Sequence, residues 1–317
     1  MKRNLLGVII PAFNREEFIG PAIESCLSQS EPIREIIVVD NHSTDKTLEI
    51  AKRYARNNKN IKVYRNKKNV GMVNNWNTGI KLSKSQYVSL LHSDDLLPPG
   101  WSKTISESIK KVKKDKIGLF FGSVASFANG NSNNKNVVRV KQFPKDIILP
   151  PKISVVKLWK NFYGNPGNSS AVIYNRLIFS TTGFFDDSCL TEADQDFHLR
   201  ILNKYSSYFI AKDLVYYRRH AFQAFYQDKH VESATDSANR IKRSVQIQQR
   251  HLGGRELIYY SYCGIYLYLL KFMIMFNWKA VKIITQIPNL LNPITIVNFP
   301  RFMSMLLARK YFSRFLS

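Results

Sequence analysis

The chain has 317 residues, of which 44% are hydrophobic and 13% aromatic, so it can bury a sizeable core and is not a disordered polymer. Its formal net charge of +24 favours anionic partners, such as nucleic acid, anionic lipid or phosphorylated substrates, without choosing among them. The three cysteines, Cys26, Cys189 and Cys263, lie far apart and form no C-x-x-C pair, which argues against a zinc site or a disulfide framework and fits a reducing cytosol.

The first ninety residues alternate between strand-like and helix-like patterns. Short apolar runs predict buried strands, and apolar residues at helical spacing predict the helices between them. In chain order we expect a strand at 5–10, a helix from Asn14 to about Gln29, a strand at 35–40, a helix at 46–55, a strand at 61–66, a helix that includes Val73, Trp76 and Ile80, and a strand at 87–91. Asn14 followed by Glu17 resembles a capping box and sets the expected start of the first helix. The alternation predicts a mostly parallel sheet with helices on both faces.

The middle of the chain continues the α/β pattern. Pro98 and Pro99 suit the first turn of a helix. The apolar face of that helix is Trp101, Ile105, Ile109 and Val112. Later elements are strands at 119–127, 168–179 and 214–220, a loop or hairpin at 128–146, and a helix at 191–205. We therefore predict an α/β domain at 1–225, with halves at 1–115 and 116–225, followed by a C-terminal helical extension at 226–317.

Two adjacent carboxylates, Asp94 and Asp95, follow the strand predicted at 87–91. Like charges this close repel, and a divalent cation beside them removes the conflict. Carboxylate oxygens suit Mg²⁺ or Mn²⁺, which often share their coordination shell with water and substrate phosphates. The pair is expected at the carboxyl end of a parallel strand, where such sheets bind ligands. The alternative is a solvated turn that caps the next helix.

A second group of acids opens the helix predicted at 191–205. Glu192 and Asp196 share a helix face, and Asp194 lies elsewhere around the axis. One of these carboxylates could accept a proton from a hydroxyl nucleophile as general base. Alternatively, the acids simply complement the helix dipole.

Two further strand ends carry candidate binding residues. Arg218, Arg219 and His220 end the last predicted strand. Arginine suits a diphosphate and histidine can bind a metal, although a basic strand end is unremarkable in so basic a chain. Asp40 either accepts a hydrogen bond from a nucleotide base or caps a turn. The other histidines show no ligand spacing and are expected to be structural or exposed: His42, His92, His198, His230 and His251.

In combination and in this order, these blocks resemble family 2 glycosyltransferases with the GT-A fold. The resemblance covers roughly residues 5–222. It rests on the segments GVIIPAFNREEFIGPAIESCLSQS, EIIVVDNHSTDKT, NVGMVNNWNTGI, YVSLLHSDDLLPPG, TEADQDFHLRI and YYRRH. The family implies a Rossmann-like α/β domain, a nucleotide-diphospho-sugar donor, a divalent metal (Mn or Mg) and usually inversion at the anomeric carbon. It also implies the synthesis of bacterial cell-surface polysaccharide or glycolipid, with a glycan or lipid-linked acceptor.

The resemblance assigns the nucleotide side of the site to the first two strand ends. By position, Pro11 and Phe13 line the nucleotide pocket, and Asp40 matches the acid that recognises the base. The family often has a second acid after Asp40, but this chain has Asn41, so contacts with the base are expected to differ.

The resemblance also assigns the reacting groups. Asp94 and Asp95 match the D-x-D-type motif that binds the donor and metal, with Asp95 the candidate for direct metal contact. Asp194 matches the catalytic base. His220, with Arg218 or Arg219, matches the late element that closes over the diphosphate and the metal.

One departure bears on the base. The family's usual Glu-Asp pair is Ala193-Asp194 here, with Glu192 displaced by one residue, so Glu192 or Asp196 could share the role. The expected reaction is a single displacement, in which the base removes the acceptor's proton while the metal and arginine stabilise the leaving diphosphate.

The tail differs in composition from the rest of the chain. Residues 257–276 contain one charge, Lys271, and are long enough to span a bilayer. They are also rich in tyrosine, which favours membrane interfaces, and basic residues follow them. We therefore expect peripheral binding to an anionic membrane, on its cytoplasmic face, where a lipid-linked acceptor would lie. The alternative is a helical subdomain packed on the catalytic domain.

Two other classes of function compete with a transferase. A nucleic-acid-binding protein would gather its arginines and aromatic residues on one platform, whereas lysines are scattered here over predicted helices and no such motif is present. A catalytically silent, membrane-bound nucleotide-sugar-binding protein would share the fold but show no turnover.

Overall fold

The computed structural model describes residues 5–112, 117–128, 138–140, 143–152, 166, 168–219, 239, 242–244, 246–247 and 250–251. The chain divides into two compact units, Met1–Tyr226 and Gln227–Ser317. All the strands given below belong to the first unit. The apolar tail predicted at 257–276, and His220, lie outside the described residues.

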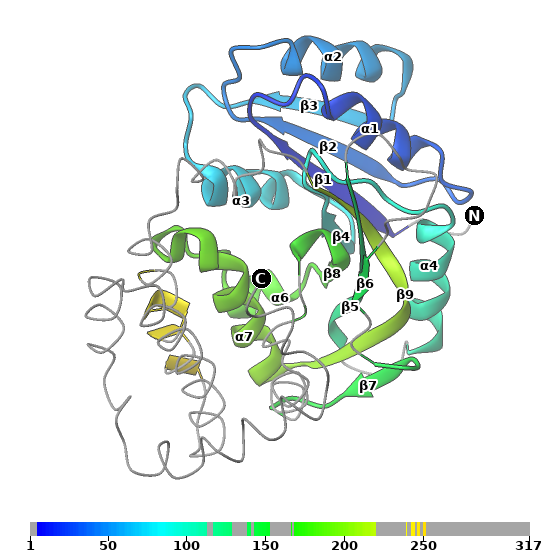
Figure 1. Ribbon diagram of the computed structural model, residues 1–317, viewed down its shortest axis with the longest axis vertical. Coiled ribbons are helices and arrows are strands. Elements are labelled where there is room, and N and C mark those ends of the chain that lie inside the picture. Colours follow the sequence, from blue (N-terminus) through cyan, green and yellow to red (C-terminus); the bar gives the residue numbers. More distant parts are fainter. Residues whose placement is uncertain are drawn as a thin grey trace. The chain divides into compact units, whose positions relative to one another are not determined.

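The N-terminal half is a parallel α/β layer. β1 (Leu6–Ala12), β2 (Glu35–Asp40), β3 (Ile61–Arg65) and β4 (Tyr87–Leu90) run parallel in the order β3-β2-β1-β4. The connections are α1 (Ile19–Leu27), α2 (Thr47–Asn57) and α3 (Met72–Leu82). Figure 1 shows α1 and α2 on one face of these strands and α3 on the other. The parallel sheet predicted for this half is confirmed.

Both faces of β1 are covered, which explains its unbroken apolar run. Val8 and Ile10 belong to the core cluster that includes Ile19 of α1. Ile9 points to the opposite face, against α3, where a Cβ added to Gly79 would lie only 2.2 Å from its Cγ2 atom. Glycine at position 79 therefore lets α3 approach the sheet closely.

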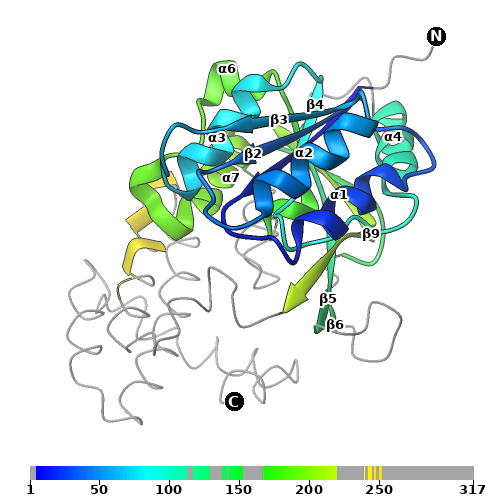
Figure 2. The same ribbon diagram turned by 90° about the horizontal axis from the view of Figure 1, so that it is seen from above.

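The C-terminal half makes the sheet mixed. β8 (Val172–Asn175) is antiparallel to both β4 and β5 (Ile117–Ala128), and β5 is parallel to β9 (Ser206–Arg219). β7 (Ile147–Leu149) pairs antiparallel with β9, and β6 (Val138–Val140) with β5. The main order is β3-β2-β1-β4-β8-β5-β9-β7. Helical segments of this half are α4 (Trp101–Lys111), η1 (Ser169–Ala171), α6 (Ile178–Thr182), η2 (Asp187–Glu192) and α7 (Ala193–Lys204), and Figure 2 shows this arrangement from above.

Several predicted element boundaries were wrong. α1 begins at Ile19 and has no side-chain cap; Asn14 has a positive φ of 51° and accepts the N–H of Thr44 at 2.9 Å instead. α4 begins after the two prolines, at Trp101, with Gly100 at its N-cap. The strand predicted at 168–179 is shorter, because its first residues form the 3₁₀ turn η1.

Candidate active site

Asp95 is a fully buried acid of the predicted donor site. Its side chain is 0% exposed. Its Oδ1 atom accepts the main-chain N–H of Arg218 at 3.1 Å, and its Oδ2 atom accepts the hydroxyl of Ser170 at 2.8 Å. The carboxylate at the end of β4 is therefore held by residues from η1 and β9.

Asp94 lies in the same turn and remains partly exposed. Its Oδ2 atom is 3.9 Å from Nε of Arg15, which follows β1. Its main-chain oxygen accepts a hydrogen bond from Nε of Arg218 at 2.9 Å. The acid pair is thus faced by two arginines from opposite ends of the domain's sequence.

Backbone hydrogen bonds join β9 to the segment that follows Asp94 and Asp95. Leu96 and Tyr216 form an antiparallel bridge with N···O distances of 3.0 and 2.9 Å. The Arg218 guanidinium lies 5.4 Å from the ring centre of Phe18 and 4.8 Å from that of Phe127. Arg219 is exposed and donates to the Ser126 hydroxyl at 3.4 Å, so Arg218 is the arginine that reaches the acid pair.

The electrostatics of the acid pair favour a bound cation. Burial raises the pKa of Asp95 well above its ordinary value, and the neighbouring charge of Asp94 raises it further. The hydrogen bond from Ser170 acts in the opposite direction. A divalent cation would stabilise the ionised form of both carboxylates.

His92 belongs to this site, although its spacing in the sequence gave no sign of it. Its Nδ1 atom lies 3.8 Å from Oδ2 of Asp95, and its ring stacks on Trp76 with 5.5 Å between centroids. Its Nε2 atom is buried and has no hydrogen-bond partner in the part of the chain that the structure describes. The clue in the sequence is its position at the end of β4, three residues before Asp95.

These residues fit a hard divalent cation that is completed by other ligands. Within the described ranges, no three histidine, cysteine or acidic side chains lie close enough to enclose an ion on their own. Asp94 and Asp95 alone could contribute carboxylate oxygens to a partial shell. Mg²⁺ and Mn²⁺ commonly complete such a shell with water and substrate phosphates.

Asp40 is engaged within the protein. It is 0% exposed, and its two oxygens accept the N–H of Ser43 at 3.3 and 3.2 Å. Nε of Arg65 lies 3.4 Å from its Oδ2 atom. This geometry is that of a turn cap at the end of β2, and recognition of a nucleotide base by Asp40 stays a prediction.

Asn41 organises the loop that precedes α3. Its amide donates to Oδ1 of Asn69 at 2.7 Å, and its own Oδ1 atom accepts from Asn66 and from the N–H of Val70, both at 3.0 Å. An aspartate could not donate the first of these hydrogen bonds. Asparagine at position 41 therefore fixes the loop in a way that the acid often found there in the family would not.

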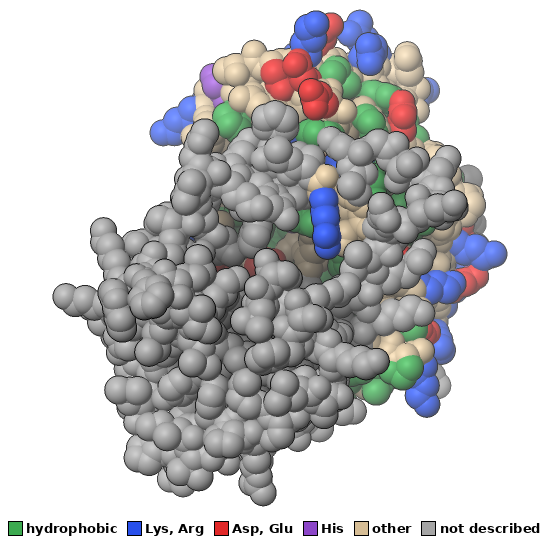
Figure 3. Space-filling model, in the orientation of Figure 1, with side chains coloured by type: hydrophobic (Ala, Val, Ile, Leu, Met, Phe, Trp, Pro, Cys, Tyr) green, Lys and Arg blue, Asp and Glu red, His purple; other side chains and the backbone are tan. Residues whose placement is uncertain are grey.

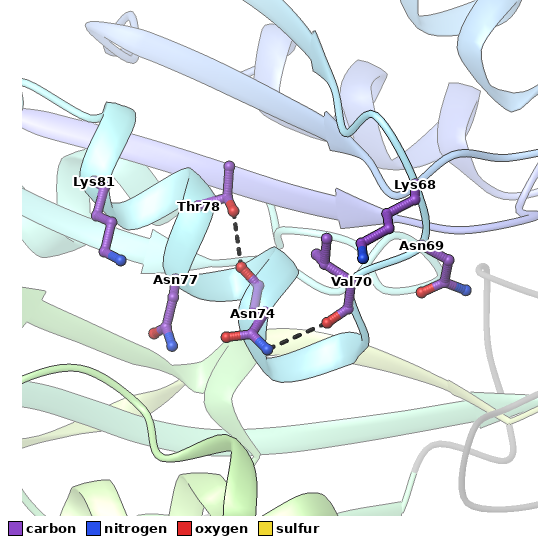
Figure 4. Close-up of a pocket in the computed structure, with 7 residues that line it drawn as sticks. All are labelled: Lys68, Asn69, Val70, Asn74, Asn77, Thr78 and Lys81. Carbon is purple, nitrogen blue, oxygen red and sulfur yellow. Dashed lines mark hydrogen bonds between the residues drawn. The ribbon is translucent and has the colours of Figure 1, made fainter.

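A pocket of 500 Å³ lies beside this loop (Figure 4). Its lining is polar and carries two cations: Lys68, Asn69, Val70, Asn74, Asn77, Thr78 and Lys81. Asn74 donates to the main-chain oxygen of Val70 at 3.2 Å and so ties the first turn of α3 to the loop. The pocket does not include the predicted nucleotide residues Pro11, which is buried in β1, and Phe13, which is 40% exposed just beyond it.

Asp194 has the properties of a general base. It lies in the first turn of α7, where its Oδ1 atom accepts the N–H of Gln195 at 2.7 Å. Burial raises its pKa to about 6, and the charge of Glu192 contributes in the same direction. A carboxyl group with this pKa is ionised at neutral pH and still basic enough to accept a proton in a reaction.

The other two acids at the start of α7, Glu192 and Asp196, form hydrogen bonds or ion pairs with neighbouring side chains. Asp196 pairs with Arg200, with N···O distances of 2.7 and 2.8 Å. The same guanidinium donates to the main-chain oxygens of Thr182 and Phe184. Glu192 is buried and accepts the Thr191 hydroxyl at 2.9 Å. Of the three acids, Asp194 is therefore the one best suited to proton transfer.

Figure 3 shows how charged side chains are distributed over the described part of one face. Over the described part of that face, Lys and Arg side chains are interspersed with Asp and Glu. In the same part of the chain, no helix is both long and apolar enough to cross a membrane.

The fold is the GT-A fold of glycosyltransferases. Among solved structures, Staphylococcus aureus TarS 1-349 in complex with UDP-GlcNAc is similar, with a TM-score of 0.61 and 18% identity over 84% of this chain and 73% of the TarS 1-349 chain. The mannosyltransferase PcManGT of Pyrobaculum calidifontis, in complex with GDP-Man and Mn²⁺, has a TM-score of 0.56 and 14% identity over 98% of this chain and 83% of that protein.

The chain belongs to glycosyl transferase family 2, whose model matches residues 7–169, just over half of the sequence. It is 29% identical over 220 residues to the poly(ribitol-phosphate) beta-N-acetylglucosaminyltransferase TarP of Staphylococcus aureus, covering 67% of this chain and 62% of TarP. A match of 27% over 233 residues covers 70% of this chain and 70% of the dolichyl N-acetyl-alpha-D-glucosaminyl phosphate 3-beta-D-2,3-diacetamido-2,3-dideoxy-beta-D-glucuronosyltransferase of Methanococcus voltae. A 34% match over 107 residues covers 34% of this chain and only 33% of an uncharacterized glycosyltransferase of Haemophilus influenzae.

Proposed function

We propose that this enzyme transfers a sugar from a nucleotide-diphospho-sugar to an acceptor hydroxyl. The observation that carries the proposal is the Asp94–Asp95 pair at the end of β4, faced by Arg15 and Arg218. Acids that hold a cation, next to arginines that bind phosphate, are the chemistry that a sugar diphosphate requires. The complexes of TarS with UDP-GlcNAc and of PcManGT with GDP-Man and Mn²⁺ support this class of donor.

The proposed reaction is a single displacement with inversion. Asp194 takes the proton of the acceptor hydroxyl as its oxygen attacks the anomeric carbon. The bond from that carbon to the diphosphate breaks on the opposite side, and its electron pair leaves with the nucleotide diphosphate. Arg15 and Arg218 stabilise the charge that develops there. Asp94 and Asp95 would hold the divalent cation together with water and the donor's phosphates, and when bound it would offset charge on the leaving group.

The cellular role we propose is the synthesis of a cell-surface polysaccharide or glycolipid at the cytoplasmic face of a membrane. The names of TarP, a poly(ribitol-phosphate) transferase, and of the Methanococcus voltae transferase, which acts on a dolichyl-linked sugar, support a polymeric or lipid-linked acceptor. The apolar and basic tail supports peripheral attachment. We expect the full-length protein to float with anionic vesicles at low salt; a protein indifferent to such vesicles would contradict the attachment.

The donor site is tested by release of nucleotide diphosphate from a panel of UDP-, GDP- and dTDP-sugars, with Mn²⁺, with Mg²⁺ or with EDTA. We expect metal-dependent release from one donor class, lost in Asp95→Ala. Glu107→Gln is the matched control, because Glu107 is an exposed acid on α4. Metal-dependent binding without turnover, in the presence of varied acceptors, would favour a silent nucleotide-sugar-binding protein. If the protein binds no donor, Asp94 and Asp95 only form a turn before the next helix and do not bind a substrate.

A further inference from the structure

Two loops at the carboxyl ends of neighbouring strands are joined by hydrogen bonds that the proposed reaction does not use. The first loop, residues 13–18, follows β1, and the second, residues 41–46, follows β2. Because these residues lie outside helices and strands, their main-chain N–H groups need partners from elsewhere in the fold. The first loop carries Arg15, whose Nε atom lies 3.9 Å from Oδ2 of Asp94.

Three consecutive main-chain N–H groups of the first loop donate to side chains of the second loop and of the start of α2. These hydrogen bonds run from Asn14 to Ser43 Oγ at 3.0 Å, from Arg15 to Thr47 Oγ1 at 2.7 Å, and from Glu16 to Asp45 Oδ2 at 3.0 Å. The backbone on both sides of Arg15 is therefore fixed by side chains that lie about thirty residues later in the sequence.

Two further hydrogen bonds run in the opposite direction. The N–H of Thr44 donates to Oδ1 of Asn14 at 2.9 Å, and the N–H of Lys46 donates to Oε2 of Glu16 at 2.9 Å. Asn14 has a positive φ of 51°, which is uncommon for any residue other than glycine. Together, the reciprocal hydrogen bonds hold the first loop in this one backbone conformation.

The Arg15 guanidinium is oriented by the same backbone. Its Nη1 atom donates to the main-chain oxygens of Phe13 at 3.4 Å and of Asn14 at 2.9 Å. The Arg15 side chain is only 14% exposed where it faces Asp94. A change in the backbone at Asn14 or Arg15 would therefore move the cation away from the acid pair.

Thr47 supplies the acceptor for the N–H of Arg15 itself. It is the first residue of α2 and is 0% exposed. Its own N–H donates to Oδ1 of Asp45 at 2.9 Å, which fixes the start of the helix. The Thr47 hydroxyl is thus a buried, immobile group in direct contact with the backbone of Arg15.

We propose that Thr47 is a positioning residue of the donor site, whose hydroxyl holds the main chain of Arg15 and so keeps the guanidinium beside Asp94, where the donor's diphosphate would bind. This inference rests on the proposed function and extends it to a residue that does not touch the donor. Since Arg15 would stabilise the charge of the diphosphate, its displacement would weaken donor binding and slow the transfer.

The first test compares Thr47→Val and Thr47→Ser in the full-length protein. Valine replaces the hydroxyl with a methyl group of similar size, and we expect kcat/KM to fall about tenfold. Thr47→Ser keeps the hydroxyl and should stay within about twofold of wild type. Calorimetric titration with UDP, GDP and dTDP, in the presence of Mn²⁺, should show the same ranking of affinities without relying on activity. Equal behaviour of Thr47→Val and wild type would overturn the inference.

The second test is a double-mutant cycle with Arg15→Ala. If Thr47 acts through Arg15, Thr47→Val should change kcat/KM by no more than about twofold once Arg15 has been replaced. The same tenfold loss in both backgrounds would overturn the inference. Should Thr47→Val not fold, Asn14→Ala takes its place in the cycle, because Asn14 is an exposed residue that holds the same loop.

Ser85→Ala is the matched control for stability. It also removes a buried hydroxyl, which donates to Oε1 of Glu35 at 2.7 Å, but Ser85 precedes β4 and so lies at the opposite end of that strand from Asp94. We expect a lower melting temperature with kcat/KM within about twofold of wild type. An equal loss of kcat/KM in Ser85→Ala and Thr47→Val would assign both losses to stability and overturn the inference.

Failure of the proposed function gives a different result. In that case the wild type itself binds none of the three nucleotides and turns over no donor, and the inference falls with it. If the wild type is active but Arg15→Ala retains its full kcat/KM, the function stands and the role of Thr47 is excluded.

Discussion

The main-chain N–H of Arg218 donates to Oδ1 of Asp95 over 3.1 Å, joining residues 123 positions apart. The Arg218 side chain meanwhile donates to the main-chain oxygen of Asp94. One residue of β9 thus fixes the acid pair through its backbone and presents a cation beside it. This arrangement makes Arg218 a sensitive position in the proposed donor site.

Arg218→Lys should lower kcat/KM by about 100-fold, since it keeps the charge but loses the Nε donor and the planar contacts with Phe18 and Phe127. Arg219→Lys is the matched control, and we expect its kcat/KM to stay within about threefold of wild type because Arg219 is exposed and points to Ser126. Steady-state kinetics with the identified donor checks both. Equal losses in the two variants would contradict the assignment of Arg218.

Asp194→Asn should reduce kcat by at least about 100-fold, because the amide cannot accept the acceptor's proton. In the wild type, kcat/KM should fall as pH drops below about 6, where the carboxyl becomes protonated. The folded pKa lies above the ordinary value, so ionisation destabilises the folded state at higher pH. The variant's melting temperature at pH 7 should therefore equal or exceed that of wild type, and a clear drop would point to a structural role instead.

Removal of divalent metal with EDTA should abolish donor turnover, and added Mn²⁺ or Mg²⁺ should restore it. Asp95→Asn should weaken Mn²⁺ binding by at least about tenfold, because the amide is a poor ligand in place of a carboxylate. The amount of free Mn²⁺, followed by its electron paramagnetic resonance signal, reports binding without relying on activity. Unchanged Mn²⁺ affinity in Asp95→Asn would exclude Asp95 as a ligand.

Glu35→Gln should destabilise the fold by about 1–3 kcal/mol at pH 7. Oε1 of Glu35 accepts hydrogen bonds from both hydroxyls of Ser83 and Ser85 and from the N–H groups of Lys84 and Ser85, at 2.7 to 2.8 Å. Burial alone would raise the pKa of Glu35, but these hydrogen bonds lower it on balance.

The pH dependence of this effect follows from the lowered pKa. The stability that Glu35 contributes is present above its unfolded pKa and is lost as pH falls through its folded pKa. Urea titrations at pH 7 and at pH 4 should therefore show a smaller difference between wild type and Glu35→Gln at the lower pH. A difference that grows on acidification would contradict this account.

Gly79→Ala should lower the free energy of unfolding by about 1–3 kcal/mol, since the new methyl group would meet Ile9 at 2.2 Å and Val39 at 3.2 Å. Gly20→Ala in α1 is the control, because its nearest neighbour would be Tyr54 at 3.5 Å and alanine favours helix by up to about 1 kcal/mol. We expect Gly79→Ala to lower the melting temperature and Gly20→Ala to raise it. A stable Gly79→Ala variant would show that α3 can move away from the sheet.

The parallel half of the fold could be predicted because its signals are local. Each strand reads as a short apolar run, and Asp94–Asp95 stand out as like charges after one of them. The start of α1 was mispredicted because Asn14 forms its hydrogen bond with Thr44, thirty residues away, rather than with the helix. A pattern of neighbouring residues cannot reveal a hydrogen-bond partner that is distant in the sequence.

The same reasoning explains which site residues were missed. Arg15 and Ser170 reach the acid pair because β1 and β8 flank β4 in the sheet, and no spacing in the sequence encodes that geometry. His92 lies only three residues before Asp95, and its position at the end of β4 was the one local clue to it. The acidic cluster that contains Asp194 is visible in the sequence because it is local, and the resemblance to the family singled out Asp194 as the proposed base. Its distinction from Asp196 required the ion pair with Arg200, which only the structure shows.

The attachment of Asp95 to η1 and β9 also has a consequence for biosynthesis. As the polypeptide leaves the ribosome, the parallel layer emerges first, with an acid pair that still lacks the Ser170 hydroxyl and the Arg218 amide. The stretch matched by the family model ends at residue 169, just before the first of these partners. A nascent chain can therefore display the family's recognisable segment while its donor site is still unassembled, and that site matures only when β9 has been made.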